Sequence, residues 1–463
     1  MDFKIETIDH YTRNNDMQLI NAPPPKLNCQ PEERKIRPLY SLTTHEYLDC
    51  GKVEEHMESL LQYMRKKGLN EKPNFVTLKQ LMASVACGDM KQLFIIPFMG
   101  ILFLLPKETK SEDESISDEL MMKKKESIRK GFQYGGNYHH FMTRKSENEP
   151  IPTVRNSFKA VLKTTVEDQS VLYSGEIDAL GGIDEHIELK VVSGGALNPW
   201  FWLNKSKWVY WQAYFGNVET ILVGARTDEN GKDLKTGPPH NWPEFSLYKV
   251  QSLKREDIPG KKYVEKKPMD ENNNDENLWN VKTGMNNIHE FFKSVKEKCT
   301  LEDFCYVATS TKSGEDVEWT VESVDENHED REEVKAFCAT LLQILGNDEE
   351  KLLKTTNENL AAFFHEDSDD DLGVTHKQKP VKNPKATRTD VKLKKKPMRV
   401  MSLDIDSDDD YGLIYKKPEA KKTNKKPMKR GNSRTDDDDE DFGEPSERKL
   451  DNRKQYKRNK RMQ

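Results

Sequence analysis

The stretch that decides the fold is residues 174–190, which read SGEIDALGGIDEHIELK. Both ends of this stretch alternate polar and apolar residues, which is the period of a half-buried β-strand. Gly181 and Gly182 lie between them and allow the chain to turn. If the two predicted strands pair as a hairpin, three carboxylates and one ammonium share a face: Glu176, Asp178, Glu188 and Lys190.

Three carboxylates on one face need a neutralising partner, because like charges a few ångströms apart raise one another's pKa. A hard divalent cation with oxygen ligands, Mg²⁺ or Mn²⁺, relieves that repulsion and stabilises charge that develops on a phosphate. Lys190 fits as a point charge beside the attacking water or the phosphoryl oxygens. The pattern therefore predicts metal-dependent hydrolysis of phosphodiester or pyrophosphate bonds. Charged residues that alternate along a solvent-facing strand give the same pattern.

The segment that follows adds three polar candidates. In KSKWVYWQ, residues 205–212, Lys205 and Gln212 lie on one face of a helix directly after the second strand. A Gln there can orient a water or a phosphate, and a Lys can contact a backbone phosphate. The next strand ends in GAR, residues 224–226, which can bring the Arg226 guanidinium to the same edge. The nearby tryptophans are either core residues or a surface on which bases stack.

Residues between 37 and 325 alternate strand-like and helix-like patterns. The apolar run 93–106 predicts a buried strand pair or a core segment, and the charged run 107–129 predicts an exposed loop or a surface helix. The expected fold class is α+β, with a mixed β-sheet and flanking helices. The expected strands are 157–166, 170–179, 186–192, 219–227, 244–250, 304–309 and 317–324, and the expected helices are 53–67, 204–215, 286–298, 334–345 and 348–364.

Charge divides the 463 residues into a body and a tail. Residues 366–463 contain 27 Lys/Arg and 21 Asp/Glu, a formal charge of +6, which leaves −12 on the residues before them. Large apolar residues in the tail are scattered singly, so burial cannot offset the entropy of ordering it. We expect a disordered tail whose basic clusters are nuclear-localisation signals or phosphate contacts, or else a generic solvated segment.

The composition disfavours several protein classes. The longest apolar run, 93–106, has 14 residues and contains Pro97. A membrane span needs about 20 residues, so no membrane partner is expected. The first 16 residues lack the apolar segment of a secretory signal, which predicts an intracellular protein. The 6 cysteines are dispersed and form no CxxC pair, which argues against a disulfide framework and against a zinc site.

The succession SGEID, IELK, KSKWVYWQ and GAR resembles the DXO-type decapping exoribonuclease family, whose fold is of the PD-(D/E)xK nuclease type. The resemblance covers residues 37–325 and is strongest over 157–230. It implies a hydrolase of RNA 5′ ends that removes incomplete or NAD-type caps and degrades RNA 5′ to 3′. It also implies two Mg²⁺ or Mn²⁺ ions and, as a partner, a larger 5′ to 3′ exoribonuclease.

The resemblance also implies roles for individual residues. The metal ligands would be Glu176, Asp178, Glu188 and the backbone carbonyl of Leu189. The residues acting at the scissile phosphate and the nucleophile would be Glu188, Lys190 and Gln212. The substrate-binding residues would be Glu176, Lys190, Gln212, Lys205, Arg226, Phe98, Met99 and Gly100.

Two earlier motifs of that family are altered in this chain. A Trp-Arg-Gly is matched by the Phe-Met-Gly of residues 98–100, so the arginine expected near RNA phosphate is missing. A Gly-h-x-h-Glu is matched by YGGNYHHF, where His139 or His140 takes the place of a metal-binding Glu. Histidine suits Mn²⁺ or softer ions better than Mg²⁺. Lys159 either supplies part of the missing positive charge or is an exposed structural lysine.

Two functions from different classes follow from these motifs. The first is a metal-dependent hydrolase acting on capped, NAD-capped or 5′-phosphorylated RNA in the nucleus, or in both nucleus and cytoplasm. The second is a pseudoenzyme that binds RNA or partners a nuclease without cutting. The order of the four motifs disfavours a third function, a DNA repair nuclease. The expected domains are a flexible leader (1–35), a decapping-nuclease-like catalytic domain (36–327), a helical extension (328–365) and the disordered tail (366–463).

Overall fold

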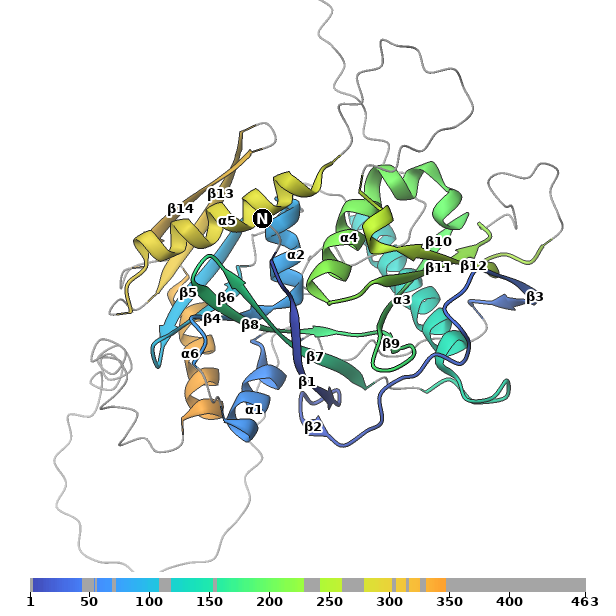
Figure 1. The fold of residues 1–463 in the computed structure, drawn as a ribbon, viewed down its shortest axis with the longest axis horizontal. Coiled ribbons are helices and arrows are strands. Elements are labelled where there is room, and N and C mark those ends of the chain that lie inside the picture. Colours follow the sequence, from blue (N-terminus) through green and yellow to red (C-terminus); the bar gives the residue numbers. More distant parts are fainter. Residues whose placement is uncertain are drawn as a thin grey trace, which may run out of the picture. The chain divides into compact units, whose positions relative to one another are not determined.

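The fold is taken from a computed structural model of the chain (Figure 1). The predicted helix 348–364 and the tail 366–463 lie outside the residues that it describes. The described residues are 3–43, 54, 56–68, 72–107, 118–152, 156–228, 242–259, 279–301, 305–313, 316–324 and 330–346.

The larger of two sheets has nine strands in the order β14-β13-β5-β6-β4-β8-β7-β1-β2. It is mixed, because β4 pairs parallel with both β6 and β8 while the other pairs are antiparallel. Its strands are β1 (Glu6–Arg13), β2 (Leu19–Ile20), β4 (Phe75–Leu78), β5 (Gln92–Phe98), β6 (Ile101–Pro106), β7 (Ser157–Val166), β8 (Gln169–Glu176), β13 (Tyr306–Ser313) and β14 (Asp316–Ser323).

The smaller sheet has five strands in the order β3-β12-β11-β10-β9. Its central pair, β10 and β11, is parallel, and the connection between them contains a helix, as parallel strands require. The strands are β3 (Arg34–Ser41), β9 (Ala179–Leu180), β10 (His186–Ser193), β11 (Thr220–Arg226) and β12 (Ser246–Lys254).

Six α-helices among the described residues cover these sheets (Figure 1). One of them begins inside the predicted charged run 107–129, which therefore contributes to a long helix rather than only a loop. The helices are α1 (Glu58–Lys67), α2 (Lys79–Cys87), α3 (Asp118–Thr143), α4 (Ser206–Phe215), α5 (Val281–Lys298) and α6 (Arg331–Leu345); three short helical turns are η2 (Gly195–Leu197), η3 (Phe201–Lys205) and η4 (Arg255–Asp257).

Apolar side chains fill three cores. One core lies between the nine-stranded sheet and helices α2, α4 and α5, and it continues onto one face of the five-stranded sheet. A second core packs α1 and α6 against the other face of the nine-stranded sheet. The third packs α3 against the other face of the five-stranded sheet. Each sheet is therefore covered on both faces, which explains why the inner strands β5, β6 and β11 read as nearly continuous apolar runs.

The N-terminal segment differs from the flexible leader expected for residues 1–35. β1 pairs antiparallel with β7 over most of its length, from Glu6 opposite Lys163 to Arg13 opposite Ser157. The Tyr11 ring stacks on Tyr63, and its hydroxyl is 3.1 Å from the Ser174 hydroxyl. These contacts order the segment although its local sequence is polar.

The central motif also differs from the predicted hairpin. β8 ends at Glu176 and belongs to the nine-stranded sheet, whereas β9 and β10 form a hairpin in the five-stranded sheet. The chain crosses between the sheets at Ile177, which is fully buried and whose N–H donates to the Phe158 carbonyl. Glu176 and Asp178 therefore do not share the face of one continuous strand.

The predicted strand 157–166 is β7 with the same ends, the remaining predicted strands are present with shifted ends, and the apolar run 93–106 is the β5–β6 hairpin. The described cysteines are free thiols, and Cys87, Cys305 and Cys338 are buried. No helix in the described ranges is long and apolar enough to cross a membrane.

Candidate active site

The candidate site begins at the free edge of β10, just past its short pairing with β9. There the Asp178 carboxylate replaces the β9 backbone as the hydrogen-bond partner of β10. Its Oδ2 accepts a hydrogen bond of 2.8 Å from the Leu189 N–H. The N–H and C=O of one strand residue point to the same side, so the Leu189 carbonyl faces the Asp178 edge as well. A carboxylate and a main-chain carbonyl are thus held at one strand edge.

Glu188 lies beside Leu189 on the face of β10 that is turned toward α4. Its side chain is buried, and its Oε1 is 3.1 Å from the Lys190 Nζ. Its Oε2 is 3.7 Å from the Nζ of Lys79, the first residue of α2. One buried carboxylate is therefore balanced by two ammonium groups, as a buried charge requires.

Lys79 also lies at the site, although none of the sequence motifs indicated it. The side chain is buried and donates a 2.6 Å hydrogen bond to the Glu176 carbonyl. It passes over Gly175, where an added Cβ would lie 2.5 Å from the Lys79 Cβ and Cδ. A Cβ on Gly216 would lie 3.5 Å from the Lys79 Cδ. A charged residue directly after the apolar strand 75–78 was the signal that could have drawn attention to it.

Gln212 lies on α4, one helical turn before Gly216, the residue beside Lys79. Its Oε1 is buried and receives no hydrogen bond from any described residue. Buried acceptors are normally satisfied, so this amide oxygen is poised to receive a hydrogen bond from a water or a substrate hydroxyl. The predicted helix face thus delivers Gln212 to the Lys79 side of β10.

The structure separates the two histidine candidates. The His139 Nε2 is 2.5 Å from the Asp178 carbonyl oxygen, so His139 lies at the site and supports the Asp178 main chain. The His140 Nε2 is instead 3.0 Å from the Glu149 carbonyl, on another side of α3. Of the two, His139 is the one beside the acidic residues.

The predicted cluster of three carboxylates is not formed. Within the described ranges, no three His, Cys, Asp or Glu side chains gather closely enough to hold a metal ion. Glu176 contributes its carbonyl, and its side chain lies on the face of the nine-stranded sheet that also carries Lys159, its register partner on β7. Asp178, Glu188 and the Leu189 carbonyl nevertheless form an all-oxygen donor set of the kind that suits a hard divalent cation.

Arg226 lies on the wrong face to join this set. It is the register partner of Ser193 in the parallel β10–β11 pair, so it shares a face with Leu189 and not with Glu188 or Lys190. The guanidinium is buried, with its central carbon 4.8 Å from the Tyr134 ring centroid. It donates to the Thr227 carbonyl. Arg226 therefore contributes to the core beneath α3 rather than to the predicted edge.

Residues 98–100 also lie away from the site. Met99 and Gly100 form the turn between β5 and β6, next to Asn74, where β4 starts. Glu176 lies at the far end of β8, six residues beyond the Ser170 that bonds Asn74, which is about 20 Å along a strand. The basic group at the site comes from Lys79 instead.

Lys205 lies at the other end of α4, seven residues before Gln212. Its Nζ is 5.7 Å from the ring centroid of Trp200, which is half-buried. The two tryptophans nearest Gln212 differ: Trp211 is fully buried, and Trp208 is partly buried against the same core. A stacking surface on this segment is therefore limited to Trp200 and the exposed part of Trp208.

Lys159 is not the exposed lysine that one interpretation expected. Its ammonium forms a buried ion pair with Glu54, which also accepts hydrogen bonds from the Ser59 N–H and hydroxyl. Burial raises the pKa of Glu54, but the Lys159 charge and the Ser59 bonds outweigh this and leave the pKa lowered. Lys159 therefore belongs to a structural network on the α1 side of the sheet.

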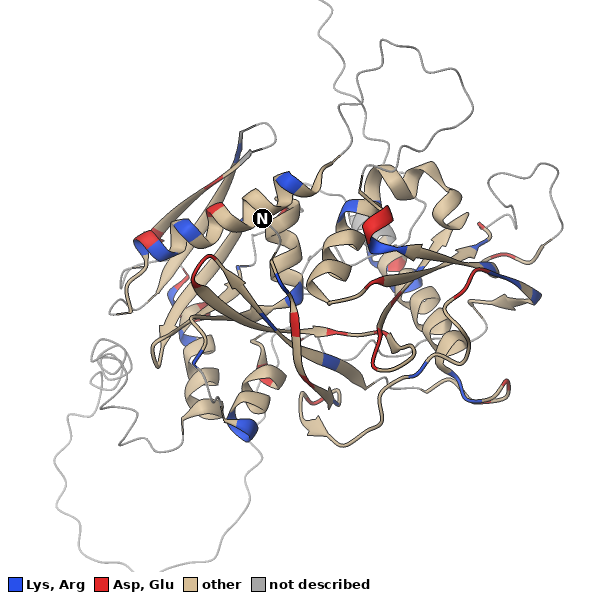
Figure 2. Cartoon of the chain, viewed as in Figure 1, with Lys and Arg blue, Asp and Glu red and all other residues tan. Residues whose placement is uncertain are grey.

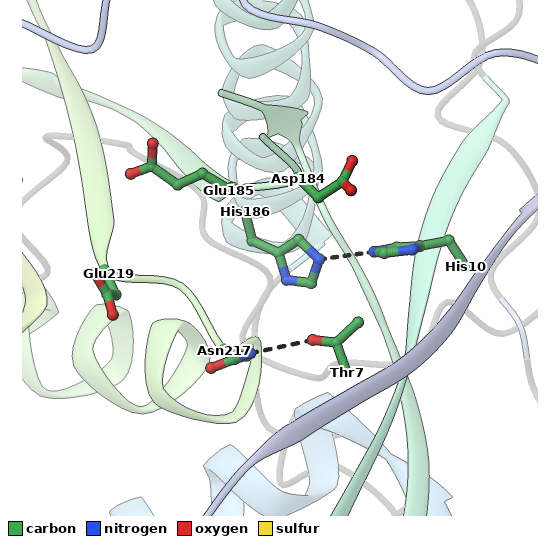
Figure 3. Close-up of a pocket in the computed structure, with 7 residues that line it drawn as sticks. All are labelled: Thr7, His10, Asp184, Glu185, His186, Asn217 and Glu219. Atoms are coloured by element: carbon green, nitrogen blue, oxygen red, sulfur yellow. Dashed lines mark hydrogen bonds between the residues drawn. The ribbon is translucent and has the colours of Figure 1, made fainter. Parts of the chain in front are cut away.

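A cavity of about 480 Å³ opens beside the start of β10 (Figure 3). The Nε2 atoms of His10 and His186 face each other across 2.8 Å, and the His186 Nδ1 is 2.9 Å from the Gly216 carbonyl. Since a carbonyl only accepts, His186 donates from Nδ1 and receives the proton of His10 on Nε2. Burial lowers the pKa of both rings, which favours this neutral pair. The lining residues are Thr7, His10, Asp184, Glu185, His186, Asn217 and Glu219.

Comparison with known proteins identifies the family. Residues 39–338 match the model of the RAI1 like PD-(D/E)XK nuclease. The fold is similar to Scheffersomyces stipitis Rai1 in complex with (3′-NADP)⁺ and calcium ion, with 15% identity, 74% of this chain and 95% of that chain covered, and a TM-score of 0.50. It is also similar to Candida albicans Rai1 in complex with pU5-Mn²⁺, with 14% identity, 74% and 95% covered, and a TM-score of 0.50.

No curated protein matches the sequence. The likeness to the two solved structures, at such low identity, concerns the fold. The family match spans well over half of the chain and confirms the family predicted from the four motifs. The chain belongs to the family of RAI1-like PD-(D/E)XK nucleases.

Proposed function

We propose that this protein is a metal-dependent hydrolase of RNA 5′ ends, which removes incomplete or NAD-type caps and then degrades the RNA 5′ to 3′. The observation that carries the proposal is the β10 edge, where Asp178, the Leu189 carbonyl and Glu188 adjoin Lys190. The proposal is supported by two Rai1 structures of the same fold, one in complex with (3′-NADP)⁺ and one with pU5-Mn²⁺.

A divalent cation held by Asp178, Glu188 and the Leu189 carbonyl would lower the pKa of a bound water and offset charge on the phosphoryl oxygens. Mn²⁺ and Mg²⁺ are the proposed ions. Lys190 extends from the same strand as Glu188 and presents its ammonium to a phosphoryl oxygen. Gln212 accepts a hydrogen bond from the attacking water through its buried Oε1 and thereby orients it.

The charges around the candidate site are mixed. Acidic and basic residues are interspersed over most of the described body (Figure 2), although the paired strands β3 and β12 carry only basic charged residues. The cavity beside β10 carries Asp184, Glu185 and Glu219, which repel phosphates. Contact with RNA phosphate is therefore assigned to Lys79, Lys190 and Lys205.

One observation favours a second function, an RNA-binding or nuclease-partner protein without catalysis. The third carboxylate does not join the other two, and the Lys79 ammonium lies at Glu188. A protein in which the Lys79 ammonium takes the place of a cation beside Glu188 could still bind a 5′ phosphate. In this role the chain would serve a 5′ to 3′ exoribonuclease as partner.

The test is cleavage of end-labelled RNA by the full-length protein with Mg²⁺ or Mn²⁺. Substrates carrying an NAD cap, an incomplete cap or a 5′ monophosphate separate the proposed activities. Glu188→Gln must abolish the activity, whereas Glu322→Gln, an exposed glutamate on β14, must retain it. Retained RNA binding with no product from any substrate would reject the hydrolase and leave the second function.

A further inference from the structure

The Lys79 side chain is buried in the site, in a space that the neighbouring residues leave open for it. The side chain is 9% exposed and ends between two oxygens, the Glu176 carbonyl at 2.6 Å and the Glu188 Oε2 at 3.7 Å. Gly175 leaves the space for its stem, because any Cβ there would overlap it. The fold is thus built to deliver an ammonium to Glu188.

This ammonium and a divalent cation compete for one carboxylate. Glu188 carries a single negative charge and already faces Lys79 and Lys190. A cation bound to Glu188 would lie within a few ångströms of both ammonium groups in a buried setting, where like charges repel strongly. The side chain of Lys190 is 16% exposed and that of Lys79 is 9% exposed, so Lys190 has more room to turn toward solvent, and Lys79 is the group that a cation must displace.

A phosphate supplies the means of displacement. An ammonium with three donors binds phosphate oxygens well, and the long lysine stem allows it to swing. A phosphate that draws Lys79 toward itself frees Glu188 for the cation, and the cation in turn strengthens the phosphate site. Such linkage is necessarily reciprocal.

Building on the proposed function, we propose that Lys79 is a positioning residue that occupies Glu188 in place of a divalent cation until an RNA 5′ phosphate draws its ammonium away. RNA and the cation then bind cooperatively. The free enzyme holds Mn²⁺ weakly, and the RNA-bound enzyme holds it tightly.

The first test measures Mn²⁺ binding to the full-length protein by isothermal titration calorimetry without RNA. Lys79→Met keeps the length of the side chain and removes its charge, so Mn²⁺ should bind at least about ten-fold more tightly, within the usual range of coupling between sites. Lys207→Met is the matched control, because Lys207 also donates a 2.6 Å hydrogen bond to a backbone carbonyl, that of Cys87. Unchanged or weaker Mn²⁺ binding by folded Lys79→Met overturns the proposal, as does the absence of binding in all three proteins.

The second test begins with the wild-type protein. A 5′-monophosphorylated oligoribonucleotide with phosphorothioate linkages should tighten Mn²⁺ binding by the wild-type protein about ten-fold. In Lys79→Met the oligoribonucleotide should tighten Mn²⁺ binding much less than it does in the wild type. Equal gains in both proteins, or no gain in the wild type, overturn the proposal. Both tests measure binding only, so a protein that couples RNA to Mn²⁺ without cleaving RNA rejects the proposed hydrolase and retains this inference.

Discussion

Gly175→Ala tests the packing that places Lys79 in the site. The new methyl group would lie 2.5 Å from the Lys79 Cβ and Cδ and 2.9 Å from its Cε, far inside ordinary van der Waals contact. The lysine must therefore leave its position or the end of β8 must shift. Added methyl groups in packed sites typically cost about 1–3 kcal/mol of unfolding free energy, and we expect a loss in that range.

Urea unfolding followed by circular dichroism measures this loss. Gly182→Ala is the control, because no atom lies within 4 Å of a Cβ built at that residue. Its unfolding free energy should stay within about 0.5 kcal/mol of the wild type, as for other substitutions at uncrowded positions. If Gly175→Ala is as stable as Gly182→Ala, Lys79 does not occupy the described path and the reasoning about the site fails.

Three further predictions concern the other charged residues. Lys159→Met should lower the unfolding free energy by about 3–5 kcal/mol, because it leaves Glu54 buried without its ammonium, whereas Lys163→Met on the same strand should cost about 1 kcal/mol or less. Folding lowers the pKa of Glu54, so its ionised carboxylate should stabilise the fold at neutral pH and lose this effect as the pH falls through the lowered pKa. The difference in unfolding free energy between the wild type and Glu54→Gln, measured by urea titration, should therefore become smaller at acid pH. Arg226→Met should reduce thermal stability but leave the salt dependence of RNA binding unchanged, since the guanidinium is buried under α3; a shallower salt slope would mean that Arg226 contacts phosphate.

Local pattern was sufficient to predict the α+β class, most of the strands, and the helix that carries Gln212. The local sequence predicts strands such as 157–166 and 219–227, because they are buried on both faces and rich in β-branched residues. The position of a strand in a sheet is a long-range property. The polar segment at the N-terminus becomes β1 only because β7 offers it an edge, which no local signal reports.

The candidate site was predicted only in part, because residue alternation is reliable inside one strand but not where the chain passes from one sheet to another. Glu188 and Lys190 share a face because both lie inside β10, where alternation holds. Alternation failed for Glu176 and Asp178, because the chain changes sheets at Ile177 between them. It also misplaced Arg226, whose face depends on its register with Ser193 rather than on its nearness to a strand end.

Metal-dependent hydrolysis at the β10 edge can be tested through the rate at which Asp178→Asn cleaves 5′-monophosphorylated RNA with Mn²⁺. Loss of one charged donor at the reacting centre should lower this rate by about a hundred-fold or more. Asp89→Asn, an exposed residue after α2 whose carboxylate pairs with Lys312 at the surface, should cleave like the wild type. Wild-type cleavage by Asp178→Asn would contradict the account.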